Sequence, residues 1–230
     1  MKLTIDVTSD VICPWCYVGK RRFEAGLAGF EHAGDVHVTW RSFELDPAAP
    51  RTREVDGATH LAQKYGMTRE RALAMQQQMT DNAAAEGLDF RFDLARAGNT
   101  FDAHRILKLA AEHGLQDAVK ERLMRAYLTE GEPIGDPEAL QRITEEAGLP
   151  ADEVRELLES DRFGEEVRSD EATAGSLGIT AVPFFVVDRA FGTAGAQPPE
   201  LLLQMLQRGW EARSPLSVVA GGPSCGPDGC

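Results

Sequence analysis

The chain has 230 residues, a formal net charge of −13 at pH 7, and 43 % hydrophobic residues. This length allows one large domain or two small ones, and the apolar share supplies a sizeable core. The acidic balance argues against a nucleic-acid-binding protein, which needs a basic face to displace counterions, and against a polybasic membrane anchor.

The start of the chain has no targeting pattern. A secretion signal needs about 7–15 apolar residues after its basic start, whereas Asp6 and Asp10 interrupt the run here. No stretch of the sequence approaches the roughly 20 apolar residues of a membrane span. We therefore expect a cytoplasmic protein, in a compartment where disulfides are mostly transient and catalytic.

The first half of the chain opens with a strand, a helix and a second strand. Apolar and polar residues alternate over residues 3–7 and again from 36 to 43 or 45, which is typical of half-buried strands. Residues 17–30 have helical spacing between these two runs. Residues 58–178 read as helices, with a short β-like run over 88–92, and Asp136 followed by Pro137 predicts a helix start.

Strand patterns return near the end of the chain. Residues 184–187 predict an apolar strand, 190–193 a hairpin partner for it, and 198–211 a last helix. The sequence therefore predicts an α/β fold in which a small mixed sheet carries an inserted helical domain. We assign residues 1–57 and 178–213 to the sheet domain, 58–177 to the helical insertion, and 214–230 to a flexible tail rich in Gly and Pro.

The four cysteines form two close pairs, a C-x-x-C at Cys13 and Cys16 and a C-x4-C at Cys225 and Cys230. A disulfide scaffold distributes its cysteines through the fold, so that interpretation is poor. Two others remain beside redox chemistry: an inert C-x-x-C, or a non-catalytic zinc site. Zinc sites usually need a second pair of ligands, and the C-terminal pair would supply it.

Cys13 stands at the junction between the first strand and the first helix. Unpaired N–H groups and the positive end of the dipole at a helix N-terminus favour the thiolate, which is the nucleophile in disulfide exchange. Pro14 suits the first helical turn, and Cys16 follows one turn later on the same face. We expect Cys13 to attack a substrate disulfide and Cys16 to resolve the mixed disulfide.

Val182 and Pro183 precede the predicted strand at 184–187, where proline is tolerated. With this proline in place, the chain resembles the thioredoxin-fold DsbA superfamily, and within it the FrnE-like branch of cytosolic dithiol oxidoreductases and isomerases. The matching segments are Asp10-Val11-Ile12-Cys13-Pro14-Trp15-Cys16-Tyr17-Val18-Gly19, Trp40-Arg41-Ser42-Phe43-Glu44-Leu45-Asp46-Pro47, Asn99-Thr100-Phe101-Asp102-Ala103-His104-Arg105 and Gly178-Ile179-Thr180-Ala181-Val182-Pro183.

The resemblance implies that Pro183 is cis, lies against the cysteine pair, exposes the preceding backbone to a substrate peptide and helps to keep metal off the thiols. It implies no tightly bound cofactor, and protein or small-molecule disulfides and dithiols as partners, with glutathione as a candidate redox partner. It also supplies a rival function. Kappa-class glutathione transferases and 2-hydroxychromene-2-carboxylate isomerases share this architecture, but they carry serine where Cys13 stands.

Substrate contacts are also expected from the resemblance. The residues concerned are Pro14, Trp15, Val182, Asn99 and His104. A histidine near Cys13 would stabilise its thiolate or move a proton. The plainer interpretation is that Asn99 caps a helix and that His104 is a surface or core residue; Trp40 is likewise expected in the core.

The C-terminal pair suggests a second redox centre. The residues between Cys225 and Cys230 include Gly-Pro and Asp-Gly, which make tight turns easy. A flexible tail of about fifteen residues spans roughly 20 Å, comparable with the radius of gyration of about 17 Å for a domain of this length. We expect this pair to exchange with Cys13 and Cys16; the alternative is an exposed tail whose thiols oxidise adventitiously. The sequence leaves the choice between monomer and homodimer open.

Overall fold

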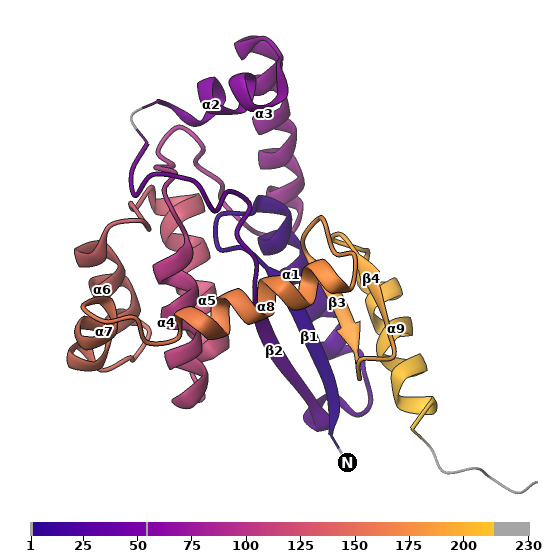
Figure 1. Cartoon of the computed structure of the whole chain (residues 1–230). Helices are drawn as coiled ribbons and strands as arrows, with labels where there is room; N and C mark the ends of the chain where they lie inside the picture. Colours follow the sequence, from indigo (N-terminus) through magenta and orange to yellow (C-terminus); the bar gives the residue numbers. More distant parts are fainter. Residues whose placement is uncertain (1, 54, 214–230) are drawn as a thin grey trace, which may run out of the picture.

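The computed structural model of the chain describes residues 2–53 and 55–213 (Figure 1). Four strands form one mixed sheet in the order β2-β1-β3-β4. The two N-terminal strands pair in parallel and the two C-terminal strands are antiparallel. The strands are β1 (Leu3–Ser9), β2 (Val36–Ser42), β3 (Phe184–Val187) and β4 (Phe191–Ala194). The predicted mixed sheet built from both ends of the chain is confirmed.

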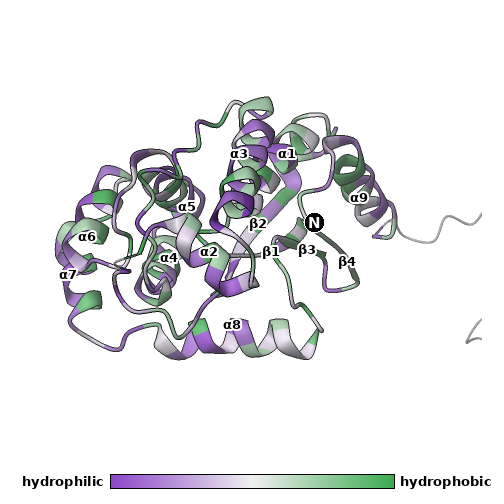
Figure 2. Cartoon of the chain, turned by 90° about the horizontal axis from the view of Figure 1, so that it is seen from above, coloured by the Kyte–Doolittle hydropathy of each residue, from purple (hydrophilic) through white to green (hydrophobic). Residues whose placement is uncertain are grey.

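One face of the sheet is covered by α1 (Pro14–Ala28) and α9 (Pro199–Glu211), which pack against each other. The alternation in β1 directs Leu3, Ile5 and Val7 into a core shared with these helices. The opposite face carries α8 (Gly164–Ser176), as Figure 2 shows. The C-terminal end of β1, where the cysteine pair begins, is thereby held between helices on both sides.

The remaining helices lie between β2 and β3 in the chain and form the helical insertion. Four of them have a separate apolar core that includes Ile106, Leu123 and Leu140, whereas α2 and α3 form a hairpin that projects from the body (Figure 1). The bounds are α2 (Gly57–Tyr65), α3 (Arg69–Ala85), α4 (Phe101–Glu112), α5 (Gln116–Arg125), α6 (Pro137–Glu146) and α7 (Ala151–Leu158). A 3-10 turn η1 (Ala33–Asp35) precedes β2, and a π-helical segment η2 (Ala126–Glu130) extends α5.

The insertion also touches the sheet. Helix α5 and helix α8 both contact β2, the edge strand, and α8 contacts α4 as well. The residue boundaries assigned to the separate units stay a prediction. The predicted start at Asp136 is confirmed, since its side chain accepts a hydrogen bond of 2.9 Å from the amide of Ala139. Within the described residues, no helix combines the length and apolar character that crossing a bilayer requires.

The predicted β-like run over residues 88–92 is wrong, because this segment forms no strand. Its alternation reflects burial instead. Leu88 and Phe90 are buried beside the cysteine pair, and Phe90 stacks on Tyr17 with 6.0 Å between ring centroids. The amide of Arg91 bonds to the carbonyl of Leu128 at 2.7 Å rather than to a neighbouring strand. The alternation of apolar and polar residues thus indicated correctly that one side of this segment is buried. It does not specify whether a strand or a helix covers that side.

Candidate active site

The cysteine pair occupies the first turn of α1. Cys13 is the N-cap residue, Pro14 is the first helical residue, and no acidic side chain lies in the first turn to neutralise the positive end of the helix. The amides of Cys16 and Tyr17 bond to the carbonyl of Cys13 at 3.0 and 3.3 Å. Both thiols are free. Cys13 is 5 % exposed and Cys16 is fully buried, so Cys13 is the sulfur nearer to solvent.

The strand that begins after Pro183 brings a second segment to the sulfurs. The peptide bond between Val182 and Pro183 is cis. The Cys13 thiol lies 3.8 Å from the carbonyl oxygen of Val182, within hydrogen-bonding distance for sulfur. Pro183 is buried, and its Cγ sits 2.8 Å from where a Cβ on Gly19 would be. The structure therefore brings together Cys13, Cys16 and Pro183, although they are about 170 residues apart in the chain.

Burial and the contact between the two thiols shift their pKa values in opposite directions. The hydrogen bond that Cys13 donates to Cys16, together with burial, raises the pKa of Cys13 well above its usual range. Burial opposes ionisation of Cys16 too, but the hydrogen bond from Cys13 and the positive charge of Lys120 hold the pKa of Cys16 below its usual range. Of the two thiols, Cys16 is therefore the more readily ionised. Moving the proton from Cys13 to Cys16 would charge the more accessible sulfur.

Behind the sulfurs lies a buried carboxylate, Asp10, at the end of β1. Its Oδ1 lies 3.3 Å from Nε2 of His104 on α4, and its Oδ2 accepts a 2.8 Å hydrogen bond from the amide of Leu45. Burial alone would raise the pKa of Asp10, but the contact with His104, the amide of Leu45 and the charge of Lys120 keep it below its usual range. A carboxylate therefore stays ionised in a site that water does not reach.

Lys120 on α5 is the second charged group that sequence reasoning missed. The side chain is fully buried. Its Nζ lies 3.4 Å from the carbonyl oxygen of Ser9 and 5.5 Å from the centre of the Trp40 ring. Burial lowers the pKa of Lys120 to about 8, against the opposing attraction of Cys16 and Asp10. Trp40 itself is in the core, as expected, with its indole N–H bonded to Asp117 at 3.0 Å.

A signal for Lys120 was present in the sequence. Val119, Leu123 and Met124 form the buried stripe of α5, and Lys120 lies on the same stripe. A lysine inside an apolar stripe predicts either a snorkelling side chain or a buried partner. Asp10 carried a weaker signal, as a charge directly after the apolar strand.

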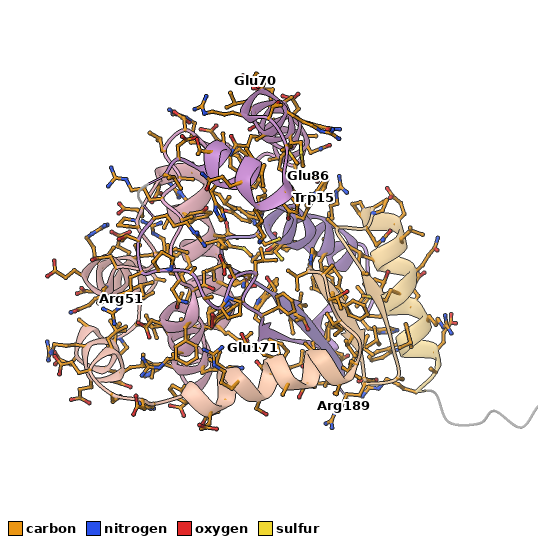
Figure 3. The ribbon with its side chains drawn as sticks, turned by 45° about the horizontal axis from the view of Figure 1, so that its top comes forward. Trp15, Arg51, Glu70, Glu86, Glu171 and Arg189 are labelled. Atoms are coloured by element: carbon orange, nitrogen blue, oxygen red, sulfur yellow. The ribbon has the colours of Figure 1, made fainter. Side chains whose placement is uncertain are left out.

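The other expected contact residues are spread around the pair. Trp15 is 44 % exposed, and Figure 3 places it on the same side of the molecule as Glu86 at the end of α3. His104 is buried against Asp10. The Oδ1 of Asn99 accepts a 2.9 Å hydrogen bond from the amide of Phe101, the first residue of α4, although the N-cap position itself is held by Thr100. Substrate contacts by these residues stay a prediction.

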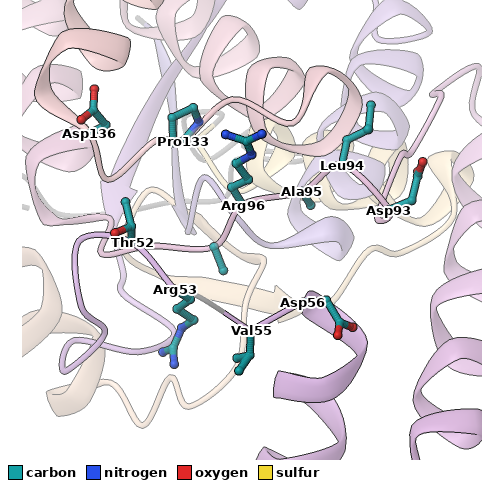
Figure 4. Close-up of a pocket in the computed structure, with 11 residues that line it drawn as sticks. Thr52, Arg53, Val55, Asp56, Asp93, Leu94, Ala95, Arg96, Pro133 and Asp136 are labelled. Carbon is teal, nitrogen blue, oxygen red and sulfur yellow. The ribbon is translucent and has the colours of Figure 1, made fainter.

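One cavity of the described surface lies away from the cysteine pair. A cavity of about 580 Å³ (Figure 4) is lined by residues 52, 53, 55, 56, 93–97, 133 and 136, including the charged Arg53, Asp93 and Arg96. The cysteine pair is not part of its wall. Arg53 is already paired with Asp46, and the lining carries charges of both signs. The cavity therefore presents no uniform charge to a ligand.

A metal site is not formed in the part of the chain that the structure describes, where no three His, Cys, Asp or Glu side chains are grouped around a common point. The zinc interpretation depends on Cys225 and Cys230. Both lie outside the described residues, and the same holds for the predicted second redox pair.

Comparison with known proteins identifies the family. Residues 4–207 match the family described as DSBA-like thioredoxin domain. The structure superposes on a probable DsbA oxidoreductase from Streptomyces coelicolor with 44 % identity and a TM-score of 0.88, covering 99 % of this chain and 98 % of that one. A cytosolic disulfide reductase, DsbM, from Pseudomonas aeruginosa with GSH has the same fold at 17 % identity, with a TM-score of 0.64 and coverage of 90 % and 99 %. An uncharacterized protein of Bacillus subtilis, YwbO, is 28 % identical over 189 residues, which are 81 % of this chain and 88 % of that one. The chain therefore belongs to the DsbA-like thioredoxin-domain family.

Proposed function

We propose that this protein is a thiol–disulfide oxidoreductase or isomerase that uses Cys13 and Cys16 on protein or small-molecule disulfides. The carrying observation is the placement of the pair: Cys13 caps α1 near the surface, Cys16 lies buried one turn later, and both thiols are free. Membership of a DsbA-like family supports redox chemistry in general. A reducing compartment, as expected from the sequence, favours reductase or isomerase work over bulk oxidation.

The reaction runs in two exchanges. In the first, the Cys13 thiolate attacks one sulfur of the substrate disulfide, a mixed disulfide forms, and one substrate thiolate leaves with a pair of electrons and takes up a proton. In the second, the Cys16 thiolate attacks Cys13, which closes the protein disulfide and releases the other substrate thiol. The reverse sequence oxidises a substrate dithiol. Two electrons pass from the protein dithiol to the substrate in the forward direction.

Glutathione is the proposed partner that restores the dithiol. The structure of Pseudomonas DsbM with GSH supports this choice, because that protein has the same fold. A glutathione-dependent transferase or isomerase is the alternative function; the thiol at Cys13, in place of the serine of those enzymes, favours dithiol chemistry instead. The narrower FrnE-like assignment and the relay through Cys225 and Cys230 are part of the proposal.

An insulin-reduction assay with glutathione as reductant tests the function. Wild type should catalyse the reaction, Cys13→Ser should abolish it, and Cys16→Ser should trap the mixed disulfide, visible by mass spectrometry. Full activity in Cys13→Ser would overturn the proposal, and glutathione-transferring activity independent of Cys16 would favour the alternative. The double variant Cys225→Ser/Cys230→Ser tests the relay: unchanged turnover and reoxidation rates would remove it.

A further inference from the structure

Arg22 joins three segments of the molecule that meet at the cysteine helix. It lies on α1 three residues after Gly19, so the two residues share one face of this helix. The Nη1 of Arg22 donates a 2.7 Å hydrogen bond to the carbonyl oxygen of Ala196, in the loop between β4 and α9. Its Nε donates a 2.6 Å bond to Oε1 of Glu86, the C-cap residue of α3. One guanidinium group therefore ties the inserted hairpin and the loop after β4 to the helix that carries the sulfurs.

The loop that Arg22 holds is bonded directly to the Pro183 segment. The amide of Gly195 donates a 2.8 Å hydrogen bond to the carbonyl of Pro183, and Ala196 is the next residue along the chain. Ala196 also packs against α1, since its Cβ lies 3.5 Å from where a Cβ on Gly19 would be. A loop that moved away from α1 would therefore draw the Pro183 segment with it.

The Pro183 segment in turn forms the surroundings of Cys13. The carbonyl oxygen of Val182 lies 3.8 Å from the Cys13 sulfur, and Cys13 is only 5 % exposed. Printed contacts thus lead without a gap from Arg22, through the loop and Pro183, to the sulfur that reacts first in the proposed function. The position of such a group matters, because a misplacement of about 1 Å can slow a reaction about 100-fold.

We propose that Arg22 is a positioning residue for disulfide exchange, which holds the loop after β4, and with it the Val182–Pro183 segment, against Cys13. Glu86 acts through Arg22, because its carboxylate fixes the guanidinium group from the side of the hairpin. The inference deepens the proposed function and rests on it. If Arg22 served the fold alone, its loss would lower stability and leave the exchange rate of the folded protein unchanged.

Arg213 supplies a closely matched control. Its Nε lies 2.8 Å from Oδ2 of Asp188 and its Nη2 donates to the carbonyl of Lys2, so it also joins a carboxylate to a backbone carbonyl. The side chains of Arg22 and Arg213 are 21 % and 23 % exposed. Lys2 precedes β1, whereas the cysteine pair follows β1, so Arg213 bonds at the opposite end of this strand. Arg213→Met should therefore cost similar stability without reaching the cysteine pair.

The test measures by stopped flow how fast the reduced, full-length protein reduces a peptide disulfide, at a temperature where every variant is folded. Arg22→Met should slow the reaction about tenfold, since a shift of a fraction of an ångström suffices for this loss. Arg213→Met should stay within about twofold of wild type. Arg22→Lys keeps one donor group for the carbonyl of Ala196, so it should recover to within about threefold of wild type.

A double-mutant cycle tests the part of Glu86. Glu86→Ala should slow exchange about threefold, because Arg22 loses one of its two anchors but keeps the bond to Ala196. The double variant Arg22→Met/Glu86→Ala should match Arg22→Met within about twofold, since the two residues act as one unit. Losses that multiply in the double variant would overturn the action of Glu86 through Arg22.

An exchange rate for Arg22→Met no lower than that of Arg213→Met would overturn the inference, and so would an Arg22→Lys variant as slow as Arg22→Met. Should Arg22→Met fail to fold, Glu86→Ala decides alone, and a rate equal to that of Arg213→Met would contradict the positioning role. Failure of the proposed function looks different, because wild type itself would then not reduce the peptide disulfide.

Discussion

Gly19 is where the cysteine helix and the Pro183 segment come closest. A Cβ at this position would lie 2.8 Å from Cγ of Pro183 and 3.5 Å from Cβ of Ala196. Carbon atoms in ordinary contact are about 3.5–4.0 Å apart, so Gly19→Ala should push Pro183 away from α1 by about 0.7–1.2 Å. Overpacking of this kind costs about 1–3 kcal/mol, of which the better helix propensity of alanine returns at most about 1 kcal/mol.

The displacement should reach the reaction as well as the stability. The carbonyl of Val182 lies 3.8 Å from the Cys13 sulfur, so a shift of about 1 Å in this segment should slow disulfide exchange by up to about 100-fold. The melting temperature should fall by up to about 8 °C, from a net loss of up to about 2 kcal/mol in a chain of this size. Calorimetry measures the stability and stopped-flow exchange with a peptide disulfide measures the rate.

Gly175→Ala is the matched control for this substitution. Gly175 also lies in a helix, α8, but nothing is within 4 Å of the position its Cβ would take. Alanine there should be neutral or stabilise the protein by up to about 1 kcal/mol. If Gly19→Ala behaves like Gly175→Ala in melting temperature and exchanges disulfides within twofold of wild type, the close approach to Pro183 does not limit the site.

Two further substitutions test the buried charges away from the sulfurs. Burial raises the pKa of Glu44 to about 7 from an ordinary 4.5, so the folded protein holds a proton there that the unfolded chain has released, and stability should fall as pH rises between these values. Urea unfolding at pH 4.5 and 8 measures the free energy of unfolding, in which Glu44→Gln should gain at most about 3 kcal/mol on wild type between the two pH values. For the control Glu156→Gln, at an exposed position, the difference from wild type should be the same at both pH values. The same difference at both pH values for Glu44→Gln as well would contradict the burial argument. Arg105 donates to the carbonyls of Leu157 and Arg162 at 2.6 and 2.8 Å, so Arg105→Lys should cost about 2–4 kcal/mol by the same measurement; a loss below about 0.5 kcal/mol would show that the fork geometry is dispensable.

The sheet could be predicted because each strand has a recognisable pattern in its own short stretch of sequence. Alternation in β1 and β2, and the apolar run of β3, place these elements within a few residues of their observed bounds. Helix α1 starts at Pro14 rather than at residue 17, since proline and the cysteine pair themselves form the first turn. The prediction of a strand at residues 88–92 was wrong because this segment packs against helices. A local pattern of alternation does not show what a segment packs against.

Of the candidate site, only the cysteine pair and Pro183 could be predicted from the sequence. The candidate roles of Cys13 and Cys16 follow from their spacing at a strand-to-helix junction, whereas that of Pro183 came from the family resemblance. Their electrostatic partners do not follow from any local pattern, because Asp10 meets His104 across 94 residues and Ser9 meets Lys120 across 111. A single sequence shows that Lys120 lies on an apolar stripe, but only the fold shows which group faces it.

The insertion therefore contributes side chains to the candidate site. The sheet domain contributes the sulfurs through α1 and the carboxylate of Asp10 through the end of β1, whereas His104 comes from α4 and Lys120 from α5. Both inserted side chains are buried at the back of the cysteine pair, where their charge or hydrogen bonds act without screening by water. Under the proposed function, the attraction between Lys120 on α5 and the cysteine pair should couple the packing of α5 to the redox state of the pair, as in any two linked equilibria. A change in the helical core that moves α5 is thus expected to alter the chemistry of Cys16 without touching either sulfur.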